Sequence, residues 1–433
     1  MRVAMIGTGY VGLVSGACLA DFGHSVVCID KDQDKIARLK AGEIPIFEPG
    51  LEELVQANVK GGRLSFSTDP AEVVGDCDAV FIAVGTPTRE EDGHADLSYV
   101  HAVAREIAPL LSGFTVVINK STVPVGTGDV VEGLIRETNP EADFAVVSNP
   151  EFLREGAAID DFKRPDRVVI GVEDDRARQV MADLYRPLDV TATPIVMVGR
   201  RTSELIKYAA NGFLAMKIAF INEVADLCEK VGADVQQVAY GIGLDKRIGP
   251  KFLMAGPGYG GSCFLKDTLA LTRTAQEAGA PISLIEATVE SNANRKKSMA
   301  GRVSAMTGDL TGKTVALLGL TFKPNTDDMR DAPSLDMAPA LIAMGARVQA
   351  FDPEGMEEAA RLLDGVDFRD GPYDAVQGAD AVVILTEWDQ FRALDLDRVK
   401  MLMNRPLMID LRNVYRPEDV RARGFTYASI GRS

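Results

Sequence analysis

The sequence predicts an α/β protein built from two doubly wound parallel-sheet domains joined by a long central helix. Three features predict this fold class. Apolar strand-like runs alternate with helical periodicity in the first segment, one long helical pattern follows, and the alternation then restarts. Such alternation indicates βαβ units, in which helices cover both faces of a parallel sheet. We therefore expect an N-terminal domain over residues 1–199, a central helical region over 200–306 and a C-terminal domain over 307–433.

The two outer segments share an order of strand-like and helical runs. The apolar runs have the length of strands and are too short for a membrane span. In the first segment the predicted strands lie at 2–7, 25–30, 79–85, 115–121, 144–150 and 167–172, with helical periodicity at 11–23 and 99–113. In the third they lie at 313–320, 346–353, 381–388 and 407–413. The third segment therefore predicts a second, smaller domain of the same type.

A single helix is predicted from Thr202 to Val231, with a further helix-rich stretch from about 280 to 306. Thr202 or Ser203 suits the N-cap of the long helix, and Gly232 suits its end. At ~1.5 Å per residue this helix would extend roughly 45 Å. It is apolar on more than one side. It is therefore either a spine that packs against a second subunit, which predicts a homodimer or higher homo-oligomer, or a helix buried between two domains.

Composition narrows the classes of function. The net charge of −16 disfavours nucleic-acid binding. The cysteines at 18, 28, 77, 228 and 263 are scattered and lack CxxC spacing, which disfavours a disulfide framework or a zinc site, and we expect no metal site. The apolar runs fall short of a membrane span, and the N-terminus fits a glycine-punctuated strand better than a signal peptide, so we expect a cytoplasmic protein. The three histidines all lie within the first 101 residues. Proton transfer by later residues must therefore fall to Asp, Glu, Lys, Cys or water.

The run "VAMIGTGYVG" places Gly7, Gly9 and Gly12 between a predicted strand and a predicted helix. Asp30 follows Gly12 by 18 residues, at the end of the next strand. This is the pattern of a Rossmann dinucleotide site, in which glycines admit the pyrophosphate and the acid binds the ribose. An acid there favours NAD over NADP. For Lys35 nearby, the residues alone favour a solvated surface charge.

Polar side chains follow two later strands, where ligands of open α/β sheets bind. Thr86 and Thr122 are candidates for contact with the cofactor or a water, although Thr122 could equally cap a helix. In "NPEFLREG", Glu151 and Glu155 are four residues apart and would share one face of a helix, but would diverge in a loop. They are either carboxylates of an acid–base site or part of a capped helix start in which Arg154 forms a surface pair with a glutamate.

Lys207 and Asn211 interrupt the apolar pattern of the long helix at i and i+4. An ammonium and an amide on one face can bind an oxyanion or a sugar hydroxyl. The alternative is that both side chains face solvent.

The run "GPGYGGSCFLKDT" surrounds Cys263 with glycines, which allow close approach of a ligand. If a helix starts at Ser262, Cys263 lies in its first turn, where the helix dipole favours a thiolate. Lys266 and Asp267 then lie within one turn of it. A thiolate beside a hydride-transfer site adds to an aldehyde, and the resulting thiohemiacetal loses a second hydride to form a thioester. Water then releases a carboxylate. The alternative is a buried, inert cysteine.

Seven motifs occur in a fixed order: "GTGYVGL", "GTPT", "KSTVPVGT", "NPEFLREG", "IKYAANGFLAMKIAFINE", "GPGYGGSCFLKD" and "GLTFKPNTDDMRDAPS". In this order they resemble the UDP-glucose/GDP-mannose dehydrogenase family over essentially the whole chain. The resemblance implies two NAD-dependent oxidations at C6 of UDP-glucose, which give UDP-glucuronate. The same chemistry on another sugar nucleotide, such as GDP-mannose, is the nearest alternative. A two-electron hydroxyacid-type dehydrogenase and an NAD-responsive regulator are two further alternatives.

The resemblance also implies roles for individual residues. Cys263 matches the nucleophile, Asp267 and Lys207 match residues that assist proton transfer and stabilise an oxyanion, and Asn211 is expected to act beside Lys207. Glu155 and Thr122 match residues that hold a hydrolytic water. Cofactor-binding positions are matched by Val11, Asp30, Lys35, Thr86, Thr122, Glu155, Lys266 and Arg330, in addition to the glycine motif. Substrate-binding positions are matched by Glu151, Phe152, Leu153, Arg154, Glu155, Lys207, Asn211, Arg247, Phe252, Leu253, Met254, Ala255, Gly256, Gly260, Lys323 and Arg412.

One position departs from the family pattern. The family usually has proline after the phenylalanine of "GGSCF", and this chain has Leu265. Proline fixes φ and suits a first helical turn. Its absence is expected to shift or loosen that turn while leaving the nucleophile in place.

Overall fold

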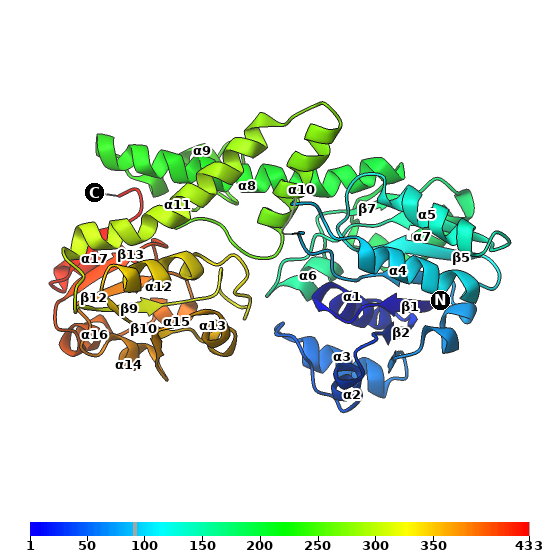
Figure 1. Ribbon diagram of the computed structural model, residues 1–433, viewed down its shortest axis with the longest axis horizontal. Coiled ribbons are helices and arrows are strands. Elements are labelled where there is room, and N and C mark those ends of the chain that lie inside the picture. Colours follow the sequence, from blue (N-terminus) through cyan, green and yellow to red (C-terminus); the bar gives the residue numbers. More distant parts are fainter. Residues whose placement is uncertain (90–92, 433) are drawn as a thin grey trace. The chain divides into compact units, whose positions relative to one another are not determined.

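The computed structural model describes residues 1–89 and 93–432. The chain divides into two compact units. Unit 1 comprises Met1–Ala210 and Arg273–Gly279, and unit 2 comprises Asn211–Thr272 and Ala280–Ser433. One long helix, α8 (Arg200–Val231), begins in unit 1 and ends in unit 2 (Figure 1). The predicted fold class, two Rossmann-like α/β domains with a long helix between them, is therefore confirmed. The three-part division of the chain stays a prediction.

Unit 1 is built on an eight-stranded sheet with the strand order β3-β2-β1-β4-β5-β6-β7-β8. The strands are β1 (Arg2–Ile6), β2 (Ser25–Ile29), β3 (Leu64–Ser67), β4 (Ala79–Ile82), β5 (Thr115–Asn119), β6 (Phe144–Ser148), β7 (Val168–Gly171) and β8 (Ile195–Val198). The helices before α8 are α1 (Tyr10–Asp21), α2 (Gln33–Lys40), α3 (Leu51–Lys60), α4 (Ser98–Ile107), α5 (Thr127–Thr138), α6 (Ala158–Lys163) and α7 (Asp175–Tyr185). The order 3-2-1-4-5-6 is that of a dinucleotide-binding sheet, with its ligand crevice where the order reverses at β1 and β4.

Two strands at the edge of this sheet run against the others. β7 pairs antiparallel with β6 through Ser148 and Gly171, and β8 is parallel to β7. The connection between β6 and β7 contains one short helix, α6, of six residues. The sheet is thus parallel through β6 and reverses there.

Unit 2 contains a six-stranded parallel sheet with the order β11-β10-β9-β12-β13-β14. Its strands are β9 (Thr314–Leu318), β10 (Arg347–Phe351), β11 (Val366–Phe368), β12 (Ala381–Ile384), β13 (Leu407–Asp410) and β14 (Thr426–Ser429). The helices around it are α12 (Pro333–Ala343), α13 (Met356–Leu362), α14 (Pro372–Val376), α15 (Asp389–Arg392), α16 (Leu396–Leu402) and α17 (Pro417–Ala422). By chain order this is again 3-2-1-4-5-6, so both units place a switch point between their first and fourth strands.

Four helices occupy the central part of the chain. They are α8, α9 (Val235–Gly243), α10 (Phe264–Glu277) and α11 (Ser283–Thr307). Gly232 has φ +72° and ends α8 as predicted. The predicted N-cap of α8 is wrong, because the helix begins two residues earlier, at Arg200. The Ser203 hydroxyl is instead buried and donates to the Ser148 carbonyl oxygen at 2.9 Å.

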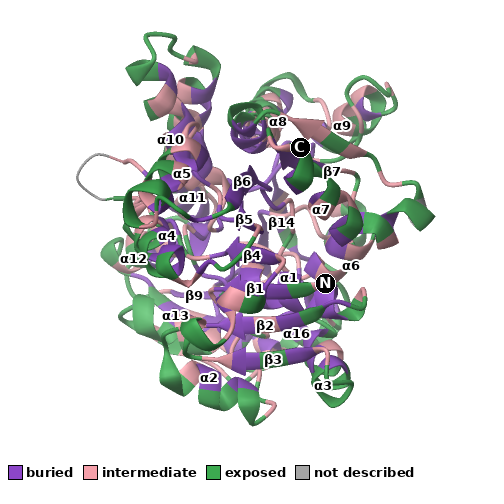
Figure 2. Ribbon diagram, turned by 90° about the vertical axis from the view of Figure 1, so that its right-hand side faces the viewer, coloured by how far each residue is buried: buried purple, intermediate pink, exposed green. Residues whose placement is uncertain are grey.

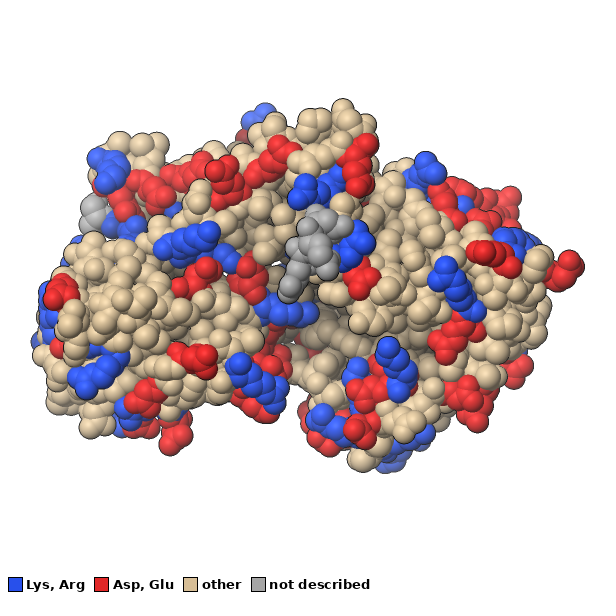
Figure 3. Space-filling view, in the orientation of Figure 1, with Lys and Arg blue, Asp and Glu red and all other residues tan. Residues whose placement is uncertain are grey.

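Apolar side chains cover both faces of each sheet. On β1, Val3 and Met5 pack on one face, whereas Ala4 and Ile6 pack on the other, as the two-residue period of a strand requires. In Figure 2, β1 and β4 are coloured mostly as buried. Within the described ranges, no helix combines the length and apolar character needed to cross a bilayer. On the face drawn in Figure 3, basic side chains are interspersed with acidic ones.

Candidate active site

The glycine motif forms a tight turn between β1 and α1 in unit 1. Gly7 has φ +102°, and a Cβ placed on it would lie 2.4 Å from the Ala83 carbonyl oxygen. A Cβ on Gly12 would lie 1.9 Å from the Gly7 carbonyl oxygen. A Cβ on Gly9 would meet no atom within 4 Å. The turn is therefore closed toward the sheet and open at Gly9, beside the N-terminus of α1 and Val11, where a pyrophosphate fits.

Asp30 lies at the end of β2, with its carboxylate held by its neighbours. Its Oδ2 accepts from the Thr8 amide at 2.9 Å, the Thr8 hydroxyl at 2.7 Å and Lys35 Nζ at 3.1 Å. Burial disfavours the charged form, but hydrogen bonds from Thr8, the Asp32 amide and Lys35 outweigh it and lower the pKa of Asp30. Among the described residues, its Oδ1 accepts a hydrogen bond only from the Asp32 amide, which leaves acceptor capacity for a ribose hydroxyl. The residues around the glycine turn therefore fit NAD. The Lys35 ammonium pairs with Asp30, so it is not simply exposed to solvent.

Thr86 and Thr122 lie together beyond the ends of β4 and β5. The Thr86 hydroxyl donates to the Thr122 carbonyl oxygen at 2.9 Å. Helix α5 begins only at Thr127, with Gly126 as its N-cap. The capping role considered for Thr122 is therefore wrong, and its side chain remains a candidate for contact with a water or the cofactor.

The segment from Glu151 to Glu155 is a loop and not a helix, so its carboxylates do not share a helix face. Glu151 turns inward. Its Oε2 accepts from the Leu153 amide at 2.5 Å, and its Oε1 accepts from Lys207 Nζ at 3.2 Å. Glu151 is 6% exposed and Lys207 3%, so the solvent-facing alternative for Lys207 is wrong. Glu155 is half-buried in the same loop.

Two other residues of this loop, Phe152 and Arg154, each pair with a different side chain of unit 1. Arg154 pairs with Asp161, with Nη2 at 2.6 Å from Oδ1. The Phe152 ring stacks under the Arg167 guanidinium, 3.6 Å from its carbon, and Lys207 Nζ lies 5.2 Å from the ring centre. The pair that the sequence suggested between Arg154 and a neighbouring glutamate is thus formed with Asp161 instead.

Sequence reasoning missed a buried lysine beside Glu151. Lys120 is 5% exposed, and its Nζ donates to Asn149 Oδ1 at 3.2 Å and lies 3.4 Å from the Tyr185 hydroxyl. Burial lowers its pKa to about 8, opposed by the nearby Glu151 carboxylate and assisted by Lys207. The signal was present in "NKSTVPVG", where the lysine directly follows a buried strand.

A buried carboxylate that was also missed holds the turn after Glu155. Glu48 Oε2 accepts from the Gly156 amide at 2.6 Å, and Oε1 accepts from the Ala158 amide at 2.7 Å. The Tyr10 hydroxyl also donates to Glu48. Burial, reinforced by Glu48, raises the pKa of Tyr10, which keeps it protonated as a donor. Glu48 thereby connects the first residue of α1 to the turn that carries Glu155.

In unit 2, Cys263 differs from the other four cysteines, all of which the structure describes. Burial raises the pKa of the Cys18 and Cys28 thiols to about 12 and that of Cys77 to about 11, whereas Cys263 is partly exposed. Helix α10 begins at Phe264, so Cys263 does not lie in the first turn as expected. It occupies the N-cap position, and its carbonyl oxygen accepts the Asp267 amide at 2.9 Å. The thiol is still at the positive end of the helix.

Asp267, one helical turn after this cysteine, is the buried centre of a polar cluster. Its side chain is 1% exposed. Asn211 Nδ2 donates to its Oδ2 at 2.6 Å, and Lys266 Nζ donates to its Oδ1 at 2.6 Å. Asn211 is 6% exposed, so this residue also does not face solvent. Asn211 lies one turn after Lys207 on α8, so both project from the same side of that helix.

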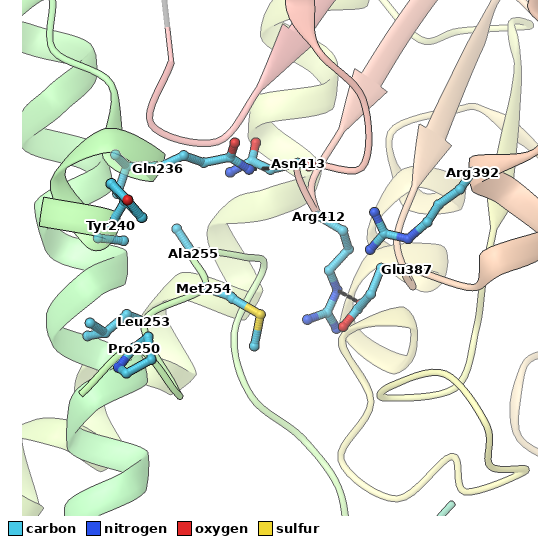
Figure 4. Close-up of a pocket in the computed structure, with 12 residues that line it drawn as sticks. Gln236, Tyr240, Pro250, Leu253, Met254, Ala255, Glu387, Arg392, Arg412 and Asn413 are labelled. Atoms are coloured by element: carbon cyan, nitrogen blue, oxygen red, sulfur yellow. Dashed lines mark hydrogen bonds and ion pairs between the residues drawn. The ribbon is translucent and has the colours of Figure 1, made fainter. Parts of the chain in front are cut away.

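A pocket of about 320 Å³ lies in unit 2 between α9, the 250–255 segment and the carboxyl ends of β12 and β13 (Figure 4). Arg412 enters it, with Nε at 3.2 Å from Glu387 Oε2 and 2.8 Å from the Leu385 carbonyl oxygen. Met254 projects toward this pair in Figure 4. The lining residues are Val235, Gln236, Ala239, Tyr240, Pro250, Leu253, Met254, Ala255, Glu387, Arg392, Arg412 and Asn413. The pocket thus gathers Leu253, Met254, Ala255 and Arg412 of the predicted substrate residues.

The remaining predicted residues of unit 2 do not line this pocket. Arg247 is exposed and pairs with Asp245 at 2.6 Å. Arg330 pairs with Asp328 at 2.8 Å. Lys323 Nζ lies 5.2 Å from the centre of the Phe322 ring. Phe252, Gly256 and Gly260 lie along the segment that leads to Cys263, with Phe252 held at φ +65° and its ring 6.0 Å from that of Phe264.

Three family models match the chain in succession. Residues 1–189 match the NAD binding domain of the UDP-glucose/GDP-mannose dehydrogenase family, residues 201–294 its central domain, and residues 316–417 its UDP binding domain. The first match agrees with the glycine turn and Asp30, and the third contains Arg412 and Lys323.

Similar proteins span the whole chain. A UDP-glucose 6-dehydrogenase of Rhizobium meliloti (strain 1021) is 65% identical, with 100% of each chain covered. The solved structure of a UDP-glucose dehydrogenase from Pyrobaculum islandicum is 40% identical, with a TM-score of 0.92 over 100% of this chain and 98% of that one. A GDP-mannose dehydrogenase structure from Pseudomonas aeruginosa is 33% identical, with a TM-score of 0.56 over 95% and 96%. The chain therefore belongs to the UDP-glucose/GDP-mannose dehydrogenase family.

Proposed function

We propose that this protein oxidises UDP-glucose at C6 to UDP-glucuronate, with NAD as cofactor and Cys263 as the nucleophile. The observation that carries the proposal is the placement of Cys263. Its side chain is partly exposed, it occupies the N-cap position of α10, and Asp267, which Lys266 and Asn211 hold by hydrogen bonds, follows it by one helical turn. A hydroxyacid-type dehydrogenase needs no such thiol. The UDP-glucose dehydrogenases among the similar proteins favour UDP-glucose over GDP-mannose as substrate.

The cofactor site supplies the oxidising power. NAD, when bound at the glycine turn, takes a hydride in each of the two oxidations. The chain contributes the open backbone at Gly9 for the pyrophosphate and the fixed, ionised Asp30 for the adenosine ribose. A 2′-phosphate would meet the negative charge of Asp30, so the site favours NAD over NADP.

The residues of the chain move protons and hold the covalent intermediate. The C6 hydroxyl loses its proton and a hydride to give an aldehyde. The Cys263 thiolate adds to the aldehyde carbon, and Lys207 and Asn211 stabilise the oxyanion of the thiohemiacetal. Loss of a proton and a second hydride leaves a thioester, and the buried Asp267 serves as a proton acceptor in these steps. Water then adds to the thioester carbon and expels the thiolate, which gives the carboxylate.

Glu155 and Thr122 are the residues to which we assign the hydrolytic water. Both lie in loops at the carboxyl ends of strands of unit 1. Glu155 is half-buried, and Thr86 fixes the Thr122 backbone through its hydroxyl. A carboxylate in such a setting can take a proton from water as it attacks.

We assign the nucleotide part of the substrate to the pocket that contains Arg412. Its guanidinium provides a local positive charge that an acidic protein needs to hold a diphosphate. The 252–256 segment contributes apolar side chains and backbone groups beside it. Lys323 and Arg247 are further cations that we assign to the diphosphate or sugar.

We further infer a homodimer or higher homo-oligomer and a cytoplasmic location. Phe213, Phe220 and Leu227 recur every seven residues along α8, and each remains more than half exposed. A stripe of this kind suits packing against a second copy. Five scattered cysteines without the spacing of a disulfide framework suit a reducing compartment.

The test is NADH stoichiometry with a panel of sugar nucleotides. We expect two NADH per UDP-glucose, slower turnover of GDP-mannose and loss of net turnover in Cys263→Ser. One NADH per substrate with full activity in Cys263→Ser would instead support a two-electron hydroxyacid-type dehydrogenase. Faster turnover of GDP-mannose would overturn the choice of substrate. Absence of NAD reduction with every sugar nucleotide would favour a regulator.

A further inference from the structure

The glycine-rich segment that leads to Cys263 has no regular secondary structure of its own. Residues 252–260 form neither helix nor strand. Gly258 has φ +122°, a backbone conformation that residues other than glycine rarely adopt. The hydrogen bonds of a helix or a strand do not hold this segment in place. Its buried backbone N–H and C=O groups must find partners elsewhere in unit 2.

Helix α11 supplies many of those partners. A Cβ on Gly258 would lie 2.7 Å from Lys296 Cγ and 3.0 Å from Asn292 Oδ1, so the helix lies directly against the segment. Arg295 Nε donates to the Gly256 carbonyl oxygen at 2.6 Å. Asn292, Arg295 and Lys296 follow the i, i+3, i+4 spacing of one helix face, and each is less than one-tenth exposed.

Asn292 makes the most specific of these contacts. Its Oδ1 accepts the Tyr259 amide at 2.8 Å, and its Nδ2 donates to the Tyr259 carbonyl oxygen at 3.0 Å. The side-chain amide therefore pairs with both backbone groups of one residue, as a neighbouring β-strand would. An asparagine amide offers both a donor and an acceptor without carrying charge, whereas an ionised aspartate of the same size offers acceptors only. Asn292 is 4% exposed, so water does not replace it easily.

Tyr259 in turn contacts the start of α10. Its ring packs edge-on against Phe264, with centroids 5.7 Å apart and an interplanar angle of 86°. Cys263 lies between these two residues in the chain and immediately precedes Phe264. A shift of the Tyr259 backbone would therefore move the residues on both sides of the thiol.

We propose that Asn292 is a positioning residue for Cys263: it fixes the backbone of Tyr259 and so holds the thiol at the N-terminus of α10. Asn292 does not touch the reacting atoms and acts through Tyr259 and Phe264. The inference rests on the proposed role of Cys263 as nucleophile. It is nevertheless measurable without turnover, through the reactivity of the thiol itself.

The experiment compares Asn292→Leu with Asn294→Leu in the full-length protein. Asn294 is exposed on the same helix, so it provides the same substitution without the contacts. Alkylation of Cys263 by iodoacetamide is followed by mass spectrometry, and kcat and KM for UDP-glucose are measured in parallel. We expect Asn292→Leu to slow both alkylation and kcat by about 10- to 100-fold, with KM changed by less than about threefold, because small displacements of a reacting group are costly. Asn294→Leu should behave as the parent.

A second variant keeps the proposal testable if Asn292→Leu does not fold. Asn292→Asp retains an acceptor for the Tyr259 amide but loses the donor to its carbonyl oxygen. We expect about a fivefold slower alkylation than in the parent, between the parent and the leucine variant. Parental alkylation and kcat in a folded Asn292 variant would overturn the inference, even if Cys263→Ser is inactive. Full turnover in Cys263→Ser would overturn the proposed function instead, while the alkylation rates would still report the positioning.

Discussion

Replacing Glu48 by glutamine should destabilise unit 1, and the magnitude follows from its hydrogen bonds. The Glu48 carboxylate accepts from the Gly156 amide, the Ala158 amide and the Tyr10 hydroxyl, and is 6% exposed. Glutamine retains one oxygen and turns an NH₂ group toward a backbone N–H, so at least one donor loses its acceptor. A buried unmet donor costs about 1–3 kcal/mol, and hydrogen bonds to a charged acceptor are worth about 1.5–3 kcal/mol. We expect a loss of about 3 kcal/mol in the free energy of unfolding.

The assay is urea unfolding of Glu48→Gln beside Glu53→Gln, which is the same change at an exposed position of α3. The control should stay within about 0.5 kcal/mol of the parent. The turn held by Glu48 carries Glu155. We therefore also expect thioester hydrolysis to slow, seen as a pre-steady-state burst of NADH followed by a slower steady rate. If Glu48→Gln unfolds within about 0.5 kcal/mol of the parent, the contacts of this carboxylate do not stabilise the turn and the reasoning fails.

Three further changes test single features. Burial lowers the pKa of Lys120 from 10.5 to about 8, so its charge costs stability below pH 8, and this cost fades as the pH rises toward 10.5. The stability advantage of Lys120→Met over the parent should therefore shrink by roughly 3 kcal/mol between pH 7 and 11. Urea unfolding measures this difference, and a difference that does not change with pH would refute the prediction. Asp30→Ala should raise KM for NAD by about tenfold and reduce the preference for NAD over NADP. Initial rates with both cofactors measure this preference. An unchanged preference would show that Asp30 does not bind the ribose. In Leu265→Pro, α10 should start one residue later, because a proline disfavours the helical conformation of the preceding Phe264. We expect a stability change within about 1 kcal/mol and slower alkylation of Cys263. Alkylation at the parental rate would show that the start of α10 does not affect the thiol.

The sequence predicted the elements that depend on short-range pattern. The glycine turn at Gly7, the end of α8 at Gly232 and the alternation of strands and helices all follow from local conformation and periodicity. It did less well where a side chain chooses a distant partner. Ser203 was a reasonable N-cap by type, but its hydroxyl bonds to Ser148 instead, 55 residues away. The helix then extends back to Arg200, whose position no local capping rule marks.

The candidate site shows the same division more sharply. Cys263 was singled out by the glycines around it, and the structure moves it by one position, from the first turn of α10 to its N-cap. Lys120 and Asn292 were not singled out. Their roles rest on partners that are 29 and 33 residues away, Asn149 and Tyr259. Polar residues within apolar patterns resemble surface residues until the fold shows what they pair with.

The first six strands of the unit 1 sheet have the same order as the six strands of unit 2, and one acidic position distinguishes the two sheets as dinucleotide sites. Asp352 follows β10 as Asp30 follows β2, at the end of the second strand of each sheet. Its Oδ2 accepts from the Leu320 amide, the Thr321 amide and hydroxyl, and Trp388 Nε1, and its Oδ1 accepts from the Glu354 and Gly355 amides. Asp352 is fully buried. Asp30 is partly exposed, and its Oδ1 accepts a hydrogen bond from the Asp32 amide and can accept another.

The internal bonds of Asp352 therefore occupy the place where a ribose hydroxyl would bind. The loop after β9 is held against this carboxylate instead of opening toward a ligand. Unit 2 must then bind its nucleotide by other groups, and Arg412 at the end of β13 lines a pocket together with a second arginine, Arg392. The same fold thus serves NAD in unit 1 through a carboxylate that is left accessible. In unit 2 it serves the UDP-sugar that we propose, through a guanidinium at the carboxyl edge of the sheet.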